Sequence, residues 1–244
     1  MLYLKKKAIL QNLIIMLKIL IKTLQIFIMI SLPLTSYSQN DKTHFLDIPV
    51  DGFKSEMIQK LKAKGYTLIP NSKDILEGEF NGTNVILSIN TNNNKVWRII
   101  VGEANETDET NIKIKFNNLI KQFTDNQRYL KEADTTIAKF IIPKDEDISY
   151  EILTKEKRYE AIFYQKTLKY DSLLKEKELL LAKEKLNDKE KQRLLDLISE
   201  SVTESINCIY NNPVWFMIQQ KGYDKYRIVI FYENKHNKAN GEGL

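Results

Sequence analysis

Short runs rich in apolar and β-branched residues predict several strands in the first half of the chain. Three such runs lie at 75–80, 85–89 and 96–101, and Asn81-Gly82 and the polar stretch 91–94 separate them. Asn-Gly between two apolar runs is a strong signal for a tight hairpin. The three runs therefore predict an antiparallel meander.

Helical spacing of apolar residues precedes and follows this meander. Apolar side chains at 53, 57, 58 and 61 recur with helical period, and Gly65 suits the C-terminal cap. A second helix is predicted from about 109 to 124, with Thr107 or Asp108 as its N-cap. One face of this second helix carries its apolar residues, Ile112, Phe116, Leu119, Ile120 and Phe123. Both helices are expected to pack on the sheet.

The middle of the chain has a weaker pattern. Three apolar stretches, Ala138–Ile142, Ile148–Leu153 and Tyr159–Tyr164, each predict a strand. The loop 143–147 follows the first of them, and the charged turn 154–158 joins the other two.

Residues 171–207 are strongly helical and contain a dense run of lysine and glutamate. A single helix over this stretch would be about 54 Å long at 1.5 Å per residue. Such a helix either projects into solvent or breaks at Asn187-Asp188, where Asn187 and Glu190 have the spacing of a capping box. Charged residues interrupt the heptad core, at Asp188 among the a positions and at Lys177, Glu184 and Lys191 among the d positions, and a coiled-coil partner is therefore not expected.

The chain closes with a hairpin over 214–218 and 226–232. The run 228–232 is apolar on both faces, which indicates a central strand. The sequence thus predicts an α+β fold: a largely antiparallel sheet with helices packed on it, and one long charged helix before a C-terminal β-hairpin. Residues 39–244 form one α+β domain in this interpretation; two modules, over 44–125 and 148–235, are the alternative.

The N-terminal segment 1–38 predicts export. It contains five lysines and no acidic residue, an apolar stretch over 24–34, and small residues before Gln39. This pattern is typical of a signal peptide cleaved near Ser38, which makes the mature protein secreted or periplasmic. An uncleaved membrane anchor is the alternative, but Lys18 and Lys22 interrupt the apolar stretch. Met16 is an alternative start.

Charge and cysteine usage narrow the partners of the mature chain. Of the 37 basic residues, five lie in the leader, which leaves 32 against 32 acidic residues. A neutral body gives no electrostatic reason to bind nucleic acid. Cys208 is the only cysteine, so no internal disulfide is expected, and its apolar surroundings predict a small buried side chain.

No catalytic residue, cofactor site or metal site is predicted. His44 and His236 each lack a second ligand at metal-binding spacing, and no phosphate-binding or nucleophile motif occurs. Carboxylates are plentiful, which keeps open the alternative of a secreted hydrolase that uses a carboxylate pair facing across a cleft. Glu77 with Glu79, and Asp145 with Asp147, are close pairs that could bind a cation, but solvated surface carboxylates are the favoured interpretation.

The sharpest side-chain signal is aromatic. Trp215, Tyr223, Tyr226 and Tyr232 gather around the C-terminal hairpin. They form either the core and rim of a sheet or an exposed surface for a glycan or protein partner. The repeat of Asn-x-Val-Trp at 94–97 and 212–215 is interpreted as coincidence, because the neighbouring elements do not align.

Several short motifs resemble a group of uncharacterised exported proteins of Bacteroidetes-type bacteria. They are Ile48-Pro49-Val50-Asp51-Gly52, Lys64-Gly65-Tyr66, Gly78-Glu79-Phe80-Asn81-Gly82, Val96-Trp97-Arg98-Ile99, and the ending Ile228 to Asn234 with Asn240-Gly241-Glu242. These motifs are turns and strands, and the charged helix at 175–193 looks like an enlargement of the pattern. The resemblance implies export and an α+β fold, and it implies no activity.

The sequence therefore favours an exported protein with a non-enzymatic role, as an interaction or envelope-associated module. Its membrane contact would be limited to the N-terminal segment. The hydrolase and the membrane-anchored protein are the two alternatives.

Overall fold

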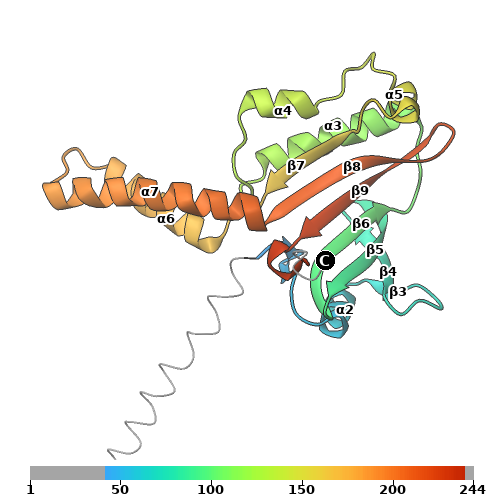
Figure 1. The fold of residues 1–244 in the computed structure, drawn as a ribbon, viewed down its shortest axis with the longest axis horizontal. Coiled ribbons are helices and arrows are strands. Elements are labelled where there is room, and N and C mark those ends of the chain that lie inside the picture. The colour runs from blue at the N-terminus through green and yellow to red at the C-terminus, as the bar shows by residue number, and fades with distance from the viewer. Residues whose placement is uncertain (1–41, 240–244) are drawn as a thin grey trace, which may run out of the picture. The chain divides into compact units, whose positions relative to one another are not determined.

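A computed structural model describes residues 42–239, which fold around an open seven-stranded antiparallel sheet (Figure 1). The spatial order of the strands is β3 (Thr67–Leu68), β4 (Ile75–Phe80), β5 (Thr83–Asn92), β6 (Lys95–Glu103), β9 (Lys225–Glu233), β8 (Pro213–Gly222) and β7 (Glu160–Tyr164). The predicted α+β class and the C-terminal hairpin are confirmed. The predicted signal peptide, its cleavage near Ser38, the anchor alternative and the start at Met16 lie outside the described residues.

Tight turns build the predicted meander β4–β5–β6. Asn81 and Gly82 have φ of 51° and 71°, and Asn93 and Asn94 have φ of 48° and 62°. Positive φ at both central residues matches the twist of hairpin strands, and Asn and Gly tolerate it best. On the other side of the sheet β9 pairs with β6 as well as with β8. The predicted central strand is therefore confirmed, and β6–β9 is the seam between the two halves of the sheet.

One face of the sheet holds the core. A row of buried side chains crosses four adjacent strands on this face, from β5 through β6 and β9 to β8: Leu87, Val101, Ile230 and Phe216. Helix α3 (Glu109–Asp125) lies across this face, with the ring of Phe116 centred 5.1 Å from that of Phe216. The five apolar residues predicted for its inner face are all buried, and Asp108 is its N-cap.

The N-terminal part of the described chain also packs against the core. Two short strands, β1 (His44–Phe45) and β2 (Ile48–Pro49), pair with each other and place Phe45 against Tyr232, with ring centroids 4.9 Å apart. Helix α2 (Lys54–Ala63) buries Met57 and Leu61 and ends before Gly65, as predicted.

Two predicted strands are wrong: Ala138–Ile142 and Ile148–Leu153. Residues Asp134–Phe140 form helix α4, and Ile148–Thr154 form helix α5. The Asn117 side chain bonds to both the N–H and the carbonyl of Ile142, so this backbone needs no neighbouring strand. Asp147 caps α5 by accepting a hydrogen bond from the N–H of Tyr150. The third predicted strand of this region is confirmed as β7.

The charged helical stretch folds as a hairpin of two helices. Helix α6 spans Leu168–Leu181 and α7 spans Asp188–Asn211. They separate at Asn187, where Asn187 and Glu190 make the predicted capping box. Arg193 of α7 binds the carboxylate of Glu176 of α6 through two hydrogen bonds of 2.8 Å. The hairpin extends away from the sheet (Figure 1). Between residues 42 and 239, no helix is long and apolar enough to cross a membrane.

Candidate functional site

The four aromatic residues singled out from the sequence do not share one surface. Trp215 is partly exposed on β8, and Tyr223 is 97% exposed in the β8–β9 turn. Tyr226 and Tyr232 are buried on β9, on the face that α3 covers. Alternate residues of a strand point to opposite faces, and this separates Trp215 from the two buried tyrosines.

Trp215 instead belongs to a cluster on the opposite face of the sheet, here called the open face. Side chains of this face, such as Ile100 and Met217, remain partly exposed. The ring of Trp215 stacks on Phe231 of β9 with centroids 3.9 Å apart and an interplanar angle of 12°. Arg98 and Glu233 stand opposite each other one step along β6 and β9. We call Trp97, Arg98, Trp215, Phe231 and Glu233 the Arg98 cluster.

The guanidinium of Arg98 is surrounded by aromatic rings. Its Cζ lies 4.2 Å from the ring centroid of Trp97, 5.2 Å from Phe231 and 5.9 Å from Trp215. Contacts of this length are cation–π interactions. Its Nη2 donates to the carboxylate of Glu233, whereas its Nε is buried with no hydrogen-bond partner among the described residues. The rings therefore hold a cation whose donors are not all used.

Glu233 joins the cluster to the C-terminal segment. Its side chain is 2% exposed and accepts a 2.8 Å hydrogen bond from the indole nitrogen of Trp215, and Lys235 lies 3.3 Å from its other oxygen. Burial alone would raise the pKa of Glu233, but the Trp215 bond and the charges of Arg98 and Lys235 outweigh it and lower that pKa. Glu233 is therefore a carboxylate at neutral pH, fully engaged by its neighbours.

A cavity of about 400 Å³ lies beside the cluster. Its cations are Arg98, Lys235 and Lys238, and its carboxylates are Glu160 and Glu233. Phe140, Ile162, Pro213 and Trp215 supply the apolar lining. Lys238 also lies 5.6 Å from the ring centroid of Trp97. The cavity thus combines flat aromatic surface with an excess of positive charge.

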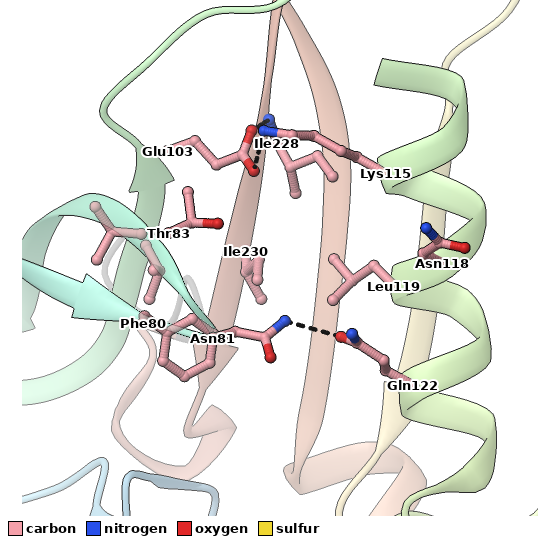
Figure 2. A pocket seen from close by; sticks show the side chains of 12 residues that line it. Phe80, Asn81, Thr83, Glu103, Lys115, Asn118, Leu119, Gln122, Ile228 and Ile230 are labelled. Carbon is pink, nitrogen blue, oxygen red and sulfur yellow. Dashed lines mark hydrogen bonds and ion pairs between the residues drawn. The ribbon is translucent and has the colours of Figure 1, made fainter. Parts of the chain in front are cut away.

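A second cavity, of about 200 Å³, lies between α3 and the β4–β5 hairpin (Figure 2). Val85, Val101, Ile228 and Ile230 line its apolar part. Its polar rim is internally paired: Asn81 donates to Gln122 at 2.8 Å, and Lys115 lies 3.1 Å from Glu103. These rim groups are already satisfied by one another, so this small cavity is a weaker candidate than the one beside Arg98.

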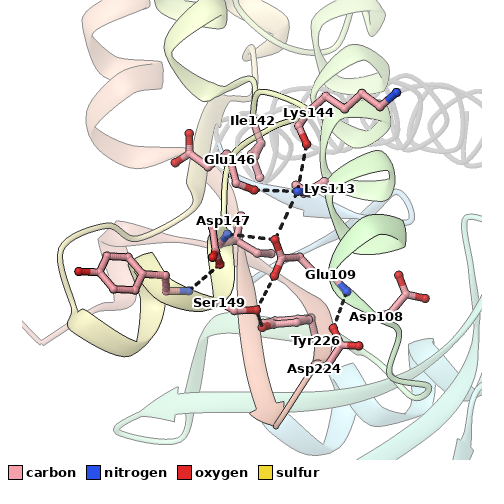
Figure 3. Close-up of polar contacts among 12 residues, drawn as sticks. Asp108, Glu109, Lys113, Ile142, Lys144, Glu146, Asp147, Ser149, Asp224 and Tyr226 are labelled. Carbon is pink, nitrogen blue, oxygen red and sulfur yellow. Dashed lines mark hydrogen bonds and ion pairs between the residues drawn. The ribbon is translucent and has the colours of Figure 1, made fainter.

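A dense polar network joins α3, α5 and β9 (Figure 3). The carboxylate of Glu109 accepts hydrogen bonds from the Ser149 hydroxyl and the Ile148 N–H and pairs with Lys113, while Ser149 also contacts the Tyr226 hydroxyl at 2.5 Å. Burial would raise the pKa of Glu109, but the bonds from Ser149, Lys113 and Ile148 lower it. A general base works best with a pKa near the operating pH. Glu109 is thus unsuited to activate Ser149, and the network fastens three elements together.

The remaining titratable candidates do not assemble into a site. Glu77 and Glu79 are exposed on β4, and Asp147 is used as the cap of α5. The Nδ1–H of His44 donates to the backbone carbonyl of Lys42 at 2.7 Å. Across residues 42–239, no group of three or more His, Cys, Asp or Glu side chains could hold a metal ion.

Comparisons with known proteins give no family for this chain. No protein-family model matches it, and neither the curated proteins nor the solved structures contain a match. The residues themselves are therefore the basis for any functional conclusion.

Sequence reasoning found Trp215 and missed its neighbours Trp97, Arg98, Phe231 and Glu233. The repeated Asn-x-Val-Trp motif was interpreted as coincidence, and its two copies do lie in different elements: Trp97 in β6 and Trp215 in β8. Yet both tryptophans approach the same guanidinium. The pairing of β6 with β9 creates this convergence, and no local pattern encodes that pairing.

Proposed function

We propose that this chain is an exported, non-enzymatic binding protein that recognises an acidic glycan through the Arg98 cluster. The observation that carries the proposal is the gathering of both tryptophans and Phe231 around one partly exposed guanidinium on the open face of the sheet. Export rests on the lysine-rich, apolar leader and on the resemblance to exported proteins of Bacteroidetes-type bacteria.

The aromatic part of the cluster suits a sugar ring. Sugar rings present apolar C–H faces, and these pack against flat aromatic side chains that have little conformational freedom to lose. The stack of Trp215 on Phe231 fixes the orientation of such a surface. Hydrogen bonding of the Trp215 indole to Glu233 fixes it further.

The charged part favours an acidic sugar over a neutral one. Lys235 pairs with Glu233, whereas Lys238 faces the Trp97 ring and has no carboxylate within ion-pair distance among the described residues. A carboxylate or sulfate on a ligand in the cavity would meet Lys238, and the positive charge of Arg98 lies in the same lining. Cation–carboxylate hydrogen bonds of this kind are the stronger ones in proteins.

The same geometry argues against a glycoside hydrolase here. Hydrolysis by a carboxylate pair needs one carboxyl with a raised pKa to protonate the leaving oxygen. Glu233 has a lowered pKa, and Arg98, Trp215 and Lys235 occupy its oxygens. Binding without turnover is the function that this arrangement supports.

Tryptophan fluorescence tests the proposal directly, because Trp97 and Trp215 are the only tryptophans in the chain. The mature chain is titrated with trigalacturonate and, in parallel, with neutral maltotriose. We expect trigalacturonate alone to shift the emission, and Lys238→Gln to weaken its binding about tenfold, equivalent to about 1.4 kcal/mol. Lys225→Gln is the matched control, since Lys225 is an exposed cation beside the β8–β9 turn. An equal response to both sugars, or to neither, contradicts the proposal.

The export part of the proposal has a separate test. The N-terminal sequence of the chain recovered outside the cytoplasm is expected to begin at Gln39. Recovery of the intact chain in the membrane fraction would support the anchored alternative, and recovery of the intact chain in the cytosol would contradict export.

A further inference from the structure

Helix α7 carries an apolar stripe that nothing covers in the described part of the chain. Its inner face, with Leu197, Ser201 and Cys208, is buried against α6 and the body. Its outer face exposes six apolar side chains by 42–71%: Leu195, Ile198, Val202, Ile206, Ile209 and Tyr210. We call these six residues the α7 stripe. Such a row of half-exposed Leu, Ile and Val is unusual for a monomer surface.

The stripe is also free of charge. The charged residues of α7 beyond Lys191 are Arg193, Asp196, Glu200 and Glu204, and at 100° per residue all of them lie on the opposite half of the helix from Val202. The outer half between Leu194 and Tyr210 contains only apolar residues and Ser199 and Ser205. A partner surface for the middle of this stripe should therefore be apolar, whereas near Ile209 it would also meet the charged side chains of Lys131, Glu132 and Glu178, which line a groove with Ile209.

The order of residues along the stripe is symmetric about Val202. Leu195 and Ile209 lie seven residues before and after it, and Ile198 and Ile206 lie four before and four after. In an isologous contact the two copies use the same surface, so that residue i of one copy meets residue j of the other and residue j meets residue i. An antiparallel pair of α7 helices centred on Val202 would bring Leu195 onto Ile209 and Ile198 onto Ile206.

Charge at the two ends of the stripe fits the same pairing. Lys191 stands at its N-terminal end, where its side chain is 62% exposed and its Nζ lies 2.9 Å from the carboxylate of Asp188 on the same turn. The last turn of α7 has no basic residue to balance the negative end of the helix dipole. Antiparallel pairing about Val202 carries Lys191 of each copy to the C-terminal end of the other helix, where a cation is favourable.

We infer that a second copy of this chain occupies the α7 stripe, as an antiparallel helix pair about Val202. Six side chains exposed by about half offer on the order of 500 Å² of apolar surface per copy, below the roughly 800 Å² per partner of a standard interface. The dimer should therefore be weak, with a dissociation constant in the range of about 10–100 µM. This inference is independent of the proposed glycan site, which lies on the sheet.

Cysteine cross-linking tests the geometry in the full mature chain. Val202→Cys places a thiol on the two-fold axis, and it should oxidise to a covalent dimer. Leu195→Cys and Ile209→Cys should each stay monomeric alone and cross-link when mixed. Thr203→Cys, one position along and about 100° around the helix, is the control and should not cross-link. Native Cys208 is fully buried and remains in place.

Sedimentation equilibrium from about 5 to 500 µM measures the association itself. Val202→Glu should abolish the dimer, and Thr203→Glu should leave it unchanged; far-UV circular dichroism shows that both variants keep their fold. A wild-type chain that stays monomeric at 500 µM overturns the inference, as does self-cross-linking of Leu195→Cys, which would mean a parallel pair. Sugar binding by Val202→Glu should match wild type, and this separates the two proposals.

Discussion

Replacement of Gly78 by alanine should destabilise the fold through one identifiable collision. A Cβ atom at Gly78 would lie 2.6 Å from Cδ1 and 2.9 Å from Cε1 of the Tyr66 ring. Tyr66 is 3% exposed, and its hydroxyl donates a 2.9 Å hydrogen bond to the carbonyl of Glu79. The ring would have to retreat by about 0.8 Å to reach ordinary contact, and that movement strains the hydrogen bond.

The expected loss can be worked from two opposing effects. Overpacking of a filled site costs about 1–3 kcal/mol. Alanine is better than glycine inside a strand by about 0.5–1 kcal/mol, because it restricts the unfolded chain. The Gly78→Ala chain should therefore be less stable than wild type by about 1–2 kcal/mol. Urea unfolding followed by tryptophan emission measures this difference.

Gly102→Ala is the matched control. Gly102 lies on β6, and a Cβ there would meet the Arg227 guanidinium at 3.7 Å, which is normal contact. This variant should be neutral or slightly stabilised. Tyr66→Leu removes the ring edge, so Gly78→Ala should cost at least about 1 kcal/mol less in that background. Equal stability of Gly78→Ala and Gly102→Ala would refute the reasoning.

Three further outcomes follow from the described contacts. The pKa of Glu109 is lowered in the folded chain. Its contribution to the free energy of unfolding is therefore complete above its unfolded pKa of about 4.3 and is lost as pH falls through the folded pKa. Glu109→Gln should lower the free energy of unfolding by about 1–2 kcal/mol at pH 7, and this free energy should vary less with pH between about pH 5 and 3 than in wild type. Burial raises the pKa of the Cys208 thiol, so a disulfide reagent should modify it only at the rate of unfolding, and modification of the native chain within the mixing time would contradict this. Deletion of 175–193 removes the outer half of the α6–α7 hairpin and should leave the tryptophan emission of the sheet unchanged; a shifted spectrum would show that the hairpin supports the Arg98 cluster.

The sequence predicted those turns and helix ends that are decided by interactions between residues close together in the chain. The Asn81-Gly82 turn, the Asp108 cap with its helical apolar face, and the Asn187 capping box are all decided by residues within a few positions of one another. The turn prediction is confirmed, and of the alternatives left open the structure has Asp108 as the cap and the helix break at Asn187. The helix break at Asn187 in particular follows from a side chain that competes for the backbone of its own first turn.

Distant contacts decided the elements that were missed. Ile142 bonds through both its N–H and its carbonyl to the Asn117 side chain of α3, and the N–H of Ile148 at the start of α5 donates to the Glu109 carboxylate of α3. The polar segment after β9 is also held by a distant contact, because Asn234 is buried and its side chain donates to the carbonyl of Val50. A short apolar run has the same pattern in a strand and in a buried helix, so sequence alone could not separate them.

For the same reason, the sequence predicted only one of the five residues of the Arg98 cluster, Trp215, as a candidate site residue. Trp215 was recognisable as an aromatic residue near a hairpin, but Arg98 lies more than a hundred positions away in the chain. The β6–β9 register brings Arg98 opposite Glu233. Register between distant strands depends on the packing of both faces of the whole sheet.

The pairing of β6 with β9 also limits when the sheet can assemble during synthesis of the chain. β6 leaves the ribosome well over a hundred residues before β9, the last strand of the described range, which must insert beside it. Until then the edge of β6 is unpaired and open to unwanted pairing with other chains. A nascent chain therefore cannot complete its sheet until nearly all of the described range has been synthesised, because β9 joins the two halves of the sheet.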